Sequence, residues 1–301
     1  MKIIKFLFIL FSSSCLNSFS IKKKYFNRKN VILNENKDTN LLSFFDYKIL
    51  NFLRKQSYCK ETIINKKENK AYNIHDLNYL KNKKTISVSP GGIQGFYFMG
   101  IVSYIKDNYD LSNVVFTGAS AGAWISLFSC YKYSNTNLVR HMLDYDYNNI
   151  KSVLELQMYF KKQLLSKYTS NEFDLKNIFL GVTVLKGFEL STNIFYNFED
   201  LEDAIDCCIA SSHIPLLTGG VINKYNNEIS FDGGFSNAPY LDINTTILHI
   251  NPSLWSNNES EDLIDYNDLL ITKAYNFTEM YNDGYKNANK NKNSLNKIFR
   301  I

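Results

Sequence analysis

The chain has 301 residues, of which 45% are hydrophobic, so it is long and apolar enough to form a sizeable core and is not a disordered chain. Its 34 basic and 29 acidic residues leave a formal charge of +5, a surplus too small to indicate a nucleic-acid-binding protein. The five cysteines include no C-x-x-C pair, which argues against a structural metal site.

The first twenty residues, MKIIKFLFILFSSSCLNSFS, combine a lysine-bearing start, an apolar run through Phe11 and a small-x-small end at Ser18 to Ser20. This order is typical of a secretory signal peptide, and the apolar run is shorter than the roughly twenty residues that a membrane-spanning helix needs. The basic stretch IKKKYFNRKN behind it also resembles the second part of a two-part organelle leader. We therefore expect secretory entry or export, with a plastid as the alternative destination.

Residues 21–83 are rich in lysine and asparagine and are expected to form a basic, partly helical N-terminal extension. Their apolar patch, LLSFFDYKILNFLRK, places Leu42, Phe45 and Ile49 at helical spacing. Such a helix can pack on the domain or lie on a lipid surface, and its charge-poor apolar face does not discriminate between the two.

From Lys84 onward, short apolar segments that read as strands alternate with helical stretches. The expected strands are TISVS, NVVFTG, IFLGVTVL, a segment that ends near Phe231, and TTILHI. The expected helices are GFYFMGIVSYIKD, AGAWISLFSCYKY, VLELQMYFKKQLLSKY, DLEDAIDCCIASS and the region of AYNFTEMYNDGYKNA. This alternation indicates parallel strands joined by helices, and hence an α/β domain over residues 84–290. Residues 291–301 are expected to form a frayed polar tail.

The motif GASAG holds Ser120 between Gly118 and Gly122, directly between a predicted strand and a predicted helix. A sharp strand-to-helix turn lifts the serine Oγ clear of the sheet, and a Cβ at either glycine would collide with neighbouring backbone. The same turn aims the amides of the first helical turn at any oxyanion that forms there. Ser120 is therefore the candidate nucleophile.

A second glycine cluster, SPGGIQGFYFMG, follows the strand TISVS and contains Gly91, Gly92 and Gly95. It does not fit a dinucleotide-binding fingerprint, because Pro90 takes the first glycine position, and it lacks the Gly-Lys-Ser/Thr of a P-loop. Consecutive glycines leave backbone N–H groups free to face a tetrahedral intermediate. The segment is therefore predicted to be an oxyanion loop.

A nucleophilic serine needs a base, which is usually a histidine held by a carboxylate. None of the four histidines is well placed for this role: His75, His141, His213 and His249. The segment SFDGGFSNAP instead puts Asp232 at a strand end, where Gly233 and Gly234 let the carboxylate approach another part of the chain. An aspartate, with a reference pKa near 3.9, can act as the base only in a dry site and within hydrogen-bond reach of Oγ.

Four elements follow one another along the chain: PGGIQG, GASAG, ASSHIP and DGG. In this order they resemble the motifs of patatin-like phospholipases over roughly Lys84 to Ala288, and in detail the chain is similar to the branch that contains adipose triglyceride lipase. The resemblance implies a three-layer α/β/α fold with a mostly parallel central sheet. It also implies cleavage of acyl esters of phospholipids, galactolipids or acylglycerols through an acyl-enzyme, without metal or cofactor, at a membrane or lipid-droplet surface.

By this resemblance, Ser120 and Asp232 form a catalytic dyad, and the glycine cluster before them supplies the oxyanion hole. The family's loop usually reads three glycines, then any residue, then Arg or Lys, then glycine. Here Pro90 stands in place of the first glycine and Gln94 in place of the basic residue, so the loop lacks a positive side chain.

Two other functions stay open. An ordinary α/β-hydrolase esterase would use a triad of Ser120, Asp232 and His249, whose order in the chain this sequence satisfies. A catalytically weak lipid-binding or storage protein of the same fold is favoured by the altered oxyanion loop and opposed by the intact serine and aspartate.

Overall fold

The computed structural model describes residues 61–72, 77–144, 152–187, 189–236, 239–241, 246–255 and 276–299. The predicted leader at 1–20, the apolar patch of the extension and His75 lie outside the described residues. The chain divides into two compact units, Met1–Leu53 and Arg54–Ile301, and all features below lie in the second. In the described part of the chain, no helix is both long enough and apolar enough to cross a membrane.

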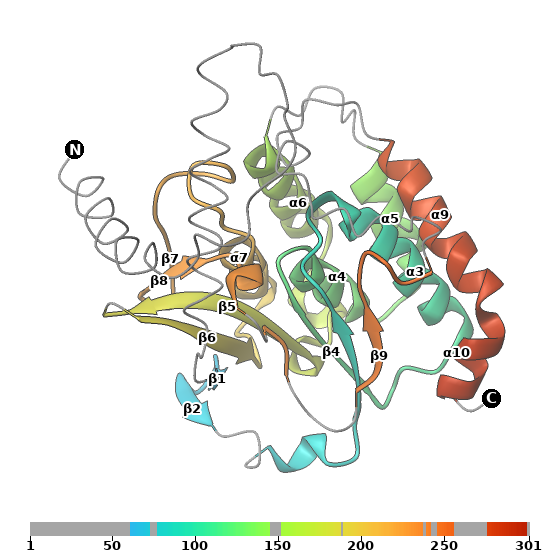
Figure 1. The fold of residues 1–301 in the computed structure, drawn as a ribbon, viewed down its shortest axis with the longest axis horizontal. Coiled ribbons are helices and arrows are strands. Elements are labelled where there is room, and N and C mark those ends of the chain that lie inside the picture. The colour runs from blue at the N-terminus through green and yellow to red at the C-terminus, as the bar shows by residue number, and fades with distance from the viewer. Residues whose placement is uncertain are drawn as a thin grey trace, which may run out of the picture. The chain divides into compact units, whose positions relative to one another are not determined.

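The second unit is organised around one sheet, in which nine strands are described (Figure 1). Their order is β2-β1-β6-β5-β4-β3-β9, and β8 pairs with both β5 and β7. The centre, from β9 through β3 and β4 to β5, is parallel. The strands are β1 Glu61–Asn65, β2 Lys70–Tyr72, β3 Lys84–Val88, β4 Val114–Ala119, β5 Ile178–Lys186, β6 Glu189–Tyr196, β7 Asn223–Tyr225, β8 Glu228–Phe231 and β9 Thr246–Ile250.

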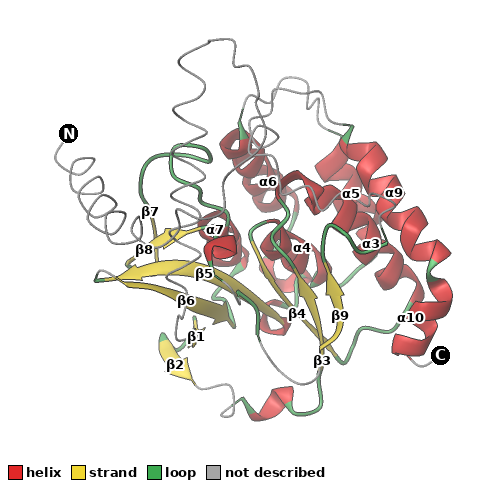
Figure 2. Cartoon of the chain, in the orientation of Figure 1, coloured by secondary structure: helices red, strands yellow, loops and turns green. Residues whose placement is uncertain are grey.

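Helices flank this sheet (Figure 2). The α-helices are α3 Gly95–Asn108, α4 Ala121–Ser129, α5 Asn135–Leu143, α6 Val153–Lys167, α7 Leu201–Ser211, α9 Phe277–Lys290 and α10 Lys292–Phe299. The 3-10 helices are η2 Asn78–Leu80, η3 Gly92–Gln94, η5 Ser170–Glu172, η6 Leu175–Asn177 and η7 Gly233–Phe235. The predicted α/β class, with a central, mostly parallel sheet flanked by helices, is confirmed.

Both faces of the central strands are buried, which explains their uninterrupted apolar sequences. In β5, Ile178 and Leu180 belong to the large core formed with the α-helices, whereas Phe179 belongs to a smaller core on the opposite face. That smaller core is completed by Leu80 of η2 and Leu241. Strand β4 is buried along its whole length, and α4 follows it immediately, so the GASAG turn lies deep in the molecule.

The sheet extends further than the sequence analysis predicted. Residues 61–72 were assigned to the N-terminal extension, but β1 pairs in parallel with β6, and β2 pairs with β1. Strand β6, ELSTNIFY, was not predicted either, although it pairs with β5 over eight residues. Its buried Thr192 and Asn193 interrupt the apolar pattern by which a central strand is recognised.

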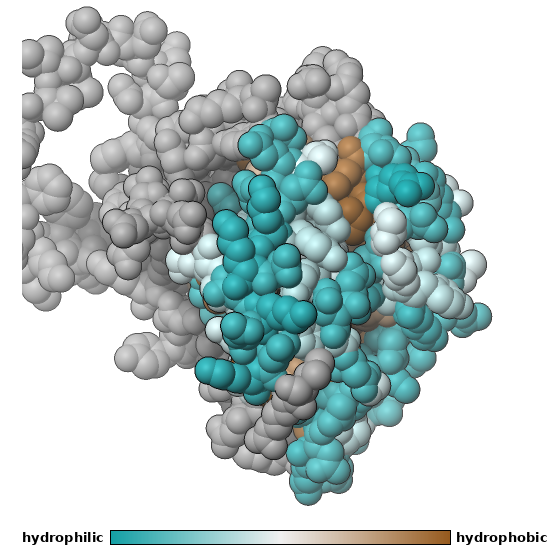
Figure 3. Space-filling model, turned by 90° about the vertical axis from the view of Figure 1, so that its right-hand side faces the viewer, coloured by the Kyte–Doolittle hydropathy of each residue, from teal (hydrophilic) through white to brown (hydrophobic). Residues whose placement is uncertain are grey.

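The C-terminal segment also differs from the predicted frayed tail. Residues Lys292–Phe299 form α10, in which Leu295 is fully buried and the Phe299 ring stacks on Tyr109 with ring centroids 4.7 Å apart. The described part of the face that carries α9 and α10 is mostly hydrophilic (Figure 3). The few apolar anchors of α10 are diluted by lysine and asparagine, which is why composition alone indicated a tail.

Helix α9 packs closely against α3 through a pair of glycines. A Cβ added to Gly100 would lie 2.0 Å from the carbonyl oxygen of Tyr281, and one added to Gly284 would lie 2.0 Å from that of Tyr97. The rings of Phe96 and Phe277 stack at the start of the two helices, with centroids 4.2 Å apart. This contact fixes the position of α3 and of the glycine cluster that precedes it.

Candidate active site

Ser120 occupies the predicted strand-to-helix turn between β4 and α4. It has a φ of 55° and a ψ of −125°, a backbone conformation that is rare for residues other than glycine. A Cβ on Gly118 would lie 2.2 Å from the carbonyl oxygen of Gly122, and a Cβ on Gly122 would lie 2.1 Å from that of Val88. The turn therefore tolerates no side chain at either glycine position.

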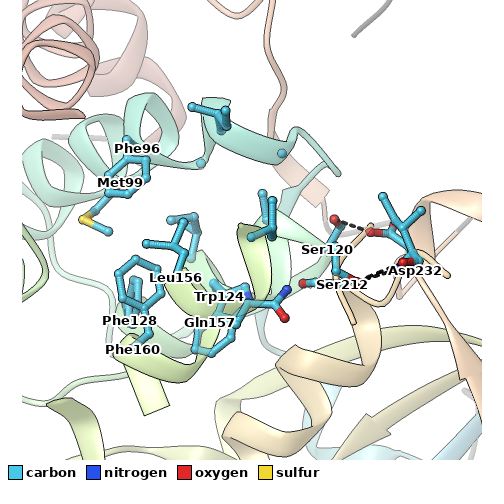
Figure 4. Close-up of a pocket in the computed structure, with 18 residues that line it drawn as sticks. Phe96, Met99, Ser120, Trp124, Phe128, Leu156, Gln157, Phe160, Ser212 and Asp232 are labelled. Carbon is cyan, nitrogen blue, oxygen red and sulfur yellow. Dashed lines mark hydrogen bonds between the residues drawn. The ribbon is translucent and has the colours of Figure 1, made fainter. Parts of the chain in front are cut away.

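The structure brings Ser120 and Asp232 together across 112 positions of sequence. Ser120 Oγ donates a hydrogen bond to Asp232 Oδ2 at 2.6 Å, and the two residues are 8% and 5% exposed (Figure 4). Asp232 Oδ1 accepts a hydrogen bond from the Gly234 N–H at 2.7 Å, and the Asp232 N–H donates to the carbonyl of His213 at 2.7 Å. The carboxylate is thus fixed on both sides and directed at the serine hydroxyl.

Burial changes the acidity of this carboxyl group. Loss of solvation raises the pKa of Asp232 to about 6, although the hydrogen bonds from Ser120 and the Gly234 N–H each lower it. The group therefore remains mostly ionised at pH 7 while being a stronger base than an aspartate in water. The site meets the two conditions under which an aspartate can deprotonate a serine directly.

The predicted oxyanion loop lies beside the serine. Gly92, Ile93 and Gly95 line the same pocket as Ser120, whereas Gly91 comes just before η3. The Gly95 N–H is already bonded to the carbonyls of Gly92 and Ile93, so it stabilises the turn. The N–H groups of Gly92 and Ile93 donate to no acceptor among the described residues and are free to bind an oxyanion.

The two departures from the usual loop sequence have different positions. Pro90 lies against the Asp-Gly-Gly turn, because a Cβ on Gly234 would be 3.2 Å from the Pro90 Cβ. Gln94 is exposed and does not line the pocket. The loop that faces the serine therefore offers backbone amides and no cationic side chain.

Ser211, at the end of α7, is a residue of the site that sequence reasoning missed. Its fully buried hydroxyl accepts a hydrogen bond from the Ser120 N–H at 2.8 Å and donates one to the carbonyl of Gly181 at 2.6 Å. It thus ties the strained Ser120 turn to β5. The motif ASSHIP contains this serine, but its sequence does not reveal which hydroxyl points inward.

None of the three described histidines is placed to complete a triad. His249 lies on β9, where its Nδ1 is 2.7 Å from Ser87 Oγ and its ring contacts Tyr240. Ser87 and His249 alternate along their strands with residues of the large core, so they lie on the sheet face away from α4. His213 contributes its carbonyl to Asp232. No hydrogen bond among the described residues joins a histidine side chain to Ser120 or Asp232.

An apolar pocket opens beside the serine. Helices α3, α4 and α6 supply its walls. The Phe160 ring lies edge-on to Trp124 and Phe128, with centroids 5.6 Å and 5.9 Å apart. The apolar lining residues are Ile93, Phe96, Met99, Ala121, Trp124, Ile125, Phe128, Val153, Leu156, Phe160 and Ile214 (Figure 4). Its apolar lining suits a hydrocarbon chain.

Together, the fold and the site define an α/β protein with a buried serine–aspartate pair next to an apolar pocket. Residues 86–243, just over half of the chain, match the family model described as patatin-like phospholipase. The chain therefore belongs to the patatin-like phospholipase family. No curated protein shows a significant match to it.

Two solved structures resemble the chain at low similarity. VipD from Legionella pneumophila is 12% identical over 56% of this chain and 49% of its own, with a TM-score of 0.35. The heterodimeric ExoU-SpcU complex from the type III secretion system of Pseudomonas aeruginosa is 13% identical over 73% of this chain and 52% of the matched chain, with a TM-score of 0.38. The matches thus span about half of each of those chains.

Proposed function

We propose that the protein is a lipid acyl hydrolase that cleaves carboxylic esters through a Ser120–Asp232 dyad. The proposal rests on one observation, the 2.6 Å hydrogen bond from Ser120 Oγ to a buried carboxylate beside an apolar pocket. Membership of the patatin-like phospholipase family supports the same reaction class. The proposed substrates are phospholipids, galactolipids or acylglycerols, and the proposed branch is the one that contains adipose triglyceride lipase.

In the proposed reaction, Asp232 takes the Ser120 proton as Oγ attacks the ester carbonyl carbon. The resulting oxyanion binds to the N–H groups of Gly92 and Ile93 and to the amino end of α4, and each good donor lowers the barrier by about 3 kcal/mol. The protonated Asp232 then gives its proton to the leaving alcohol. Water, deprotonated by the same carboxylate, attacks the acyl-enzyme and releases the fatty acid and the free serine.

A fluorophosphonate probe tests this proposal directly. We expect it to label the wild-type protein and not the Ser120→Ala variant, and we expect only the wild type to release fatty acids from mixed lipid vesicles. Circular dichroism of the variant controls for its fold. If the folded wild type is neither labelled nor active, the alternative of a lipid-binding or storage protein, which the loss of the basic residue at Gln94 favours, takes its place.

The pH dependence of the reaction should report the aspartate. Because burial raises the pKa of Asp232 to about 6 and the ionised form is the base, kcat/KM should fall about tenfold per pH unit below that value. The measurement is kcat/KM for a soluble p-nitrophenyl ester between pH 4.5 and 8. A profile that stays flat down to pH 4.5 would show that the rate does not depend on this carboxylate.

We also propose that the protein works at a lipid surface, as the sequence analysis expected. Exposed apolar side chains lie next to the pocket on α6 and on the loop after α7: Leu154, Met158, Leu216 and Ile222. Leu216 is 71% exposed, and the loop adjoins α6 because a Cβ on Gly219 would be 4.0 Å from Leu154 Cδ1. Such a rim can insert into a lipid surface while the pocket accepts an acyl chain.

Replacing both Leu216 and Met158 with serine should therefore weaken cosedimentation with phosphatidylcholine–phosphatidylserine vesicles by roughly tenfold, because each substitution removes apolar surface from the contact with lipid. Hydrolysis of a soluble ester should be unaffected. Tyr133→Ser is the matched control, because Tyr133 is also exposed but lies before α5 and outside this rim. Equal vesicle binding by the double variant would contradict the proposed orientation. The proposed secretory or plastid destination rests on the sequence of residues 1–30 alone.

A further inference from the structure

Gln157 is a buried polar residue in the wall of the apolar pocket. It lies on α6, is 3% exposed and lines the pocket together with Trp124 and Phe160. Its side-chain oxygen has no hydrogen-bond partner among the residues that the structure describes. A buried carboxamide oxygen without a partner is costly, so its presence in an otherwise apolar wall requires an explanation.

The neighbouring polar side chains cannot satisfy this oxygen, because their hydrogens are already used. Ser120 Oγ donates to Asp232, and Ser212 Oγ donates to the carbonyl of Cys208 at 2.9 Å. Thr218 Oγ1 donates to the carbonyl of Ile214 at 3.2 Å. Among the polar side chains described in the pocket wall, Gln157 alone has a buried polar atom without any hydrogen-bond partner in the described part of the chain.

The direction of the side chain restricts what can pair with it. In Figure 4 the Gln157 carboxamide points toward the end of the pocket where Ser212 and Ser120 lie, and away from Phe128. A group that reaches it would therefore sit near the reacting ester and not at the far end of an acyl chain. To satisfy this acceptor, that group must donate a hydrogen bond, and a hydroxyl does so without bringing a second charge into the buried site.

We propose that Gln157 is a specificity-determining residue, whose side-chain oxygen accepts a hydrogen bond from a hydroxyl group of the lipid close to the ester that is cleaved. The inference builds on the proposed function and narrows its substrate class. Two lipid types carry such a hydroxyl: an acyl chain hydroxylated at its second or third carbon, and a monoacyl lipid with a free glycerol hydroxyl. A site built to bond a hydroxyl discriminates strongly against the analogue that lacks it.

Two pairs of substrates distinguish a hydroxyl on the acyl chain from a hydroxyl on the glycerol. The first pair is the p-nitrophenyl esters of dodecanoic acid and 3-hydroxydodecanoic acid. The second is 1-acyl lysophosphatidylcholine and its analogue with a methyl ether on the second glycerol carbon. In at least one pair, kcat/KM of the wild type should be about tenfold higher for the hydroxyl-bearing substrate.

The Gln157→Leu variant should bring that ratio to about one. Its kcat/KM for the substrate without the hydroxyl should rise, because leucine fills the same space without an unpaired oxygen. Gln163→Leu is the matched control, since Gln163 lies on the same helix but does not line the pocket. It should leave the ratio as in the wild type. A wild-type ratio near one in both pairs, or an unchanged ratio in Gln157→Leu, would overturn the inference.

A binding measurement separates this inference from the proposed function. Trp124 lies in the pocket wall, and the chain has two tryptophans, so fluorescence of the Ser120→Ala protein can report ligand entry without turnover. Dodecanoic acid, 3-hydroxydodecanoic acid and the two phosphatidylcholine analogues are the probes. At least one hydroxyl-bearing probe should bind about tenfold more tightly than its analogue, and Gln157→Leu should abolish the difference. Equal binding within both pairs overturns the inference even if the wild type hydrolyses no ester.

Discussion

Replacing Asp232 with asparagine should lower kcat/KM for ester hydrolysis by about 10²- to 10⁴-fold without unfolding the protein, the range expected when a general base is lost. The amide keeps an oxygen that can accept the Gly234 N–H, but its NH₂ group now faces Ser120 Oγ and cannot take a proton. Steady-state hydrolysis of a soluble ester, compared with the wild type at pH 8, measures the loss.

The same substitution should make the folded state more stable above pH 6. The pKa of Asp232 is raised from 3.8 to about 6, so the folded protein loses stability as the pH rises through this interval and the buried carboxyl ionises. Removing the charge should recover about 3 kcal/mol at pH 8 and almost nothing below pH 4. Urea unfolding of the wild type and the variant at the two pH values measures this difference in free energy. A more stable variant at pH 8 would show that the buried carboxylate lowers the stability of the folded protein.

His249→Ala is the contrasting variant for this experiment. Because His249 is bonded to Ser87 on the far face of the sheet, its loss should leave ester turnover within about threefold of the wild type. If His249→Ala abolished turnover with the fold preserved, while Asp232→Asn remained active, the triad of an ordinary α/β-hydrolase would have to replace the dyad.

Gly122→Ala should strongly destabilise the protein and disturb the Ser120 turn. The added Cβ would lie 2.1 Å from the carbonyl oxygen of Val88 and 2.8 Å from that of Ser89, and neither is a flexible side chain that could move aside. We expect a loss of at least about 3 kcal/mol in the free energy of unfolding, together with loss of fluorophosphonate labelling as the Ser120 turn is displaced. Urea unfolding and labelling of the folded fraction measure the two effects.

Gly220→Ala provides the matched control. Its added Cβ would have one neighbour within 4 Å, the Ile222 carbonyl oxygen at 3.9 Å, and its φ is not in the left-handed region. Unfolding free energy and labelling should both stay close to those of the wild type. A Gly122→Ala protein as stable as Gly220→Ala would mean that α4 can move away from β3.

The elements predicted from the sequence are strands that are apolar on both faces and helices that are clearly apolar or amphipathic. The buried strands β3, β4 and β5 and the helices that follow them have apolar sequences that admit few alternatives. Strands β1 and β6 were missed because they lie toward the edge of the sheet, where polar residues such as Asn65 and Asn193 are buried within the strands. Helix α10 was missed because few apolar positions anchor it.

Prediction of the site from the sequence was limited in a similar way. Ser120 and Asp232 could be picked out because each stands in a glycine-rich turn and the four motifs follow the order seen in a known family, and the structure brings the two residues within hydrogen-bond distance. Ser211 and Gln157 could not be recognised, since their importance lies in where a single polar atom points after the chain has folded. The Gly95 N–H, which was expected to face an oxyanion, instead donates to the carbonyls of Gly92 and Ile93 in η3.

The glycine contact between α3 and α9 has a consequence for how much of the chain a working domain requires. The segment that matches the family ends at residue 243, but β9 and α9 both lie after it. A protein truncated there would lose the outer neighbour of β3 and uncover the groove in α3 at Gly100. The catalytic motifs would all be present, yet the helix that follows the glycine loop would have lost its support. The segment needed to support the glycine loop is thus longer than the segment that matches the family model.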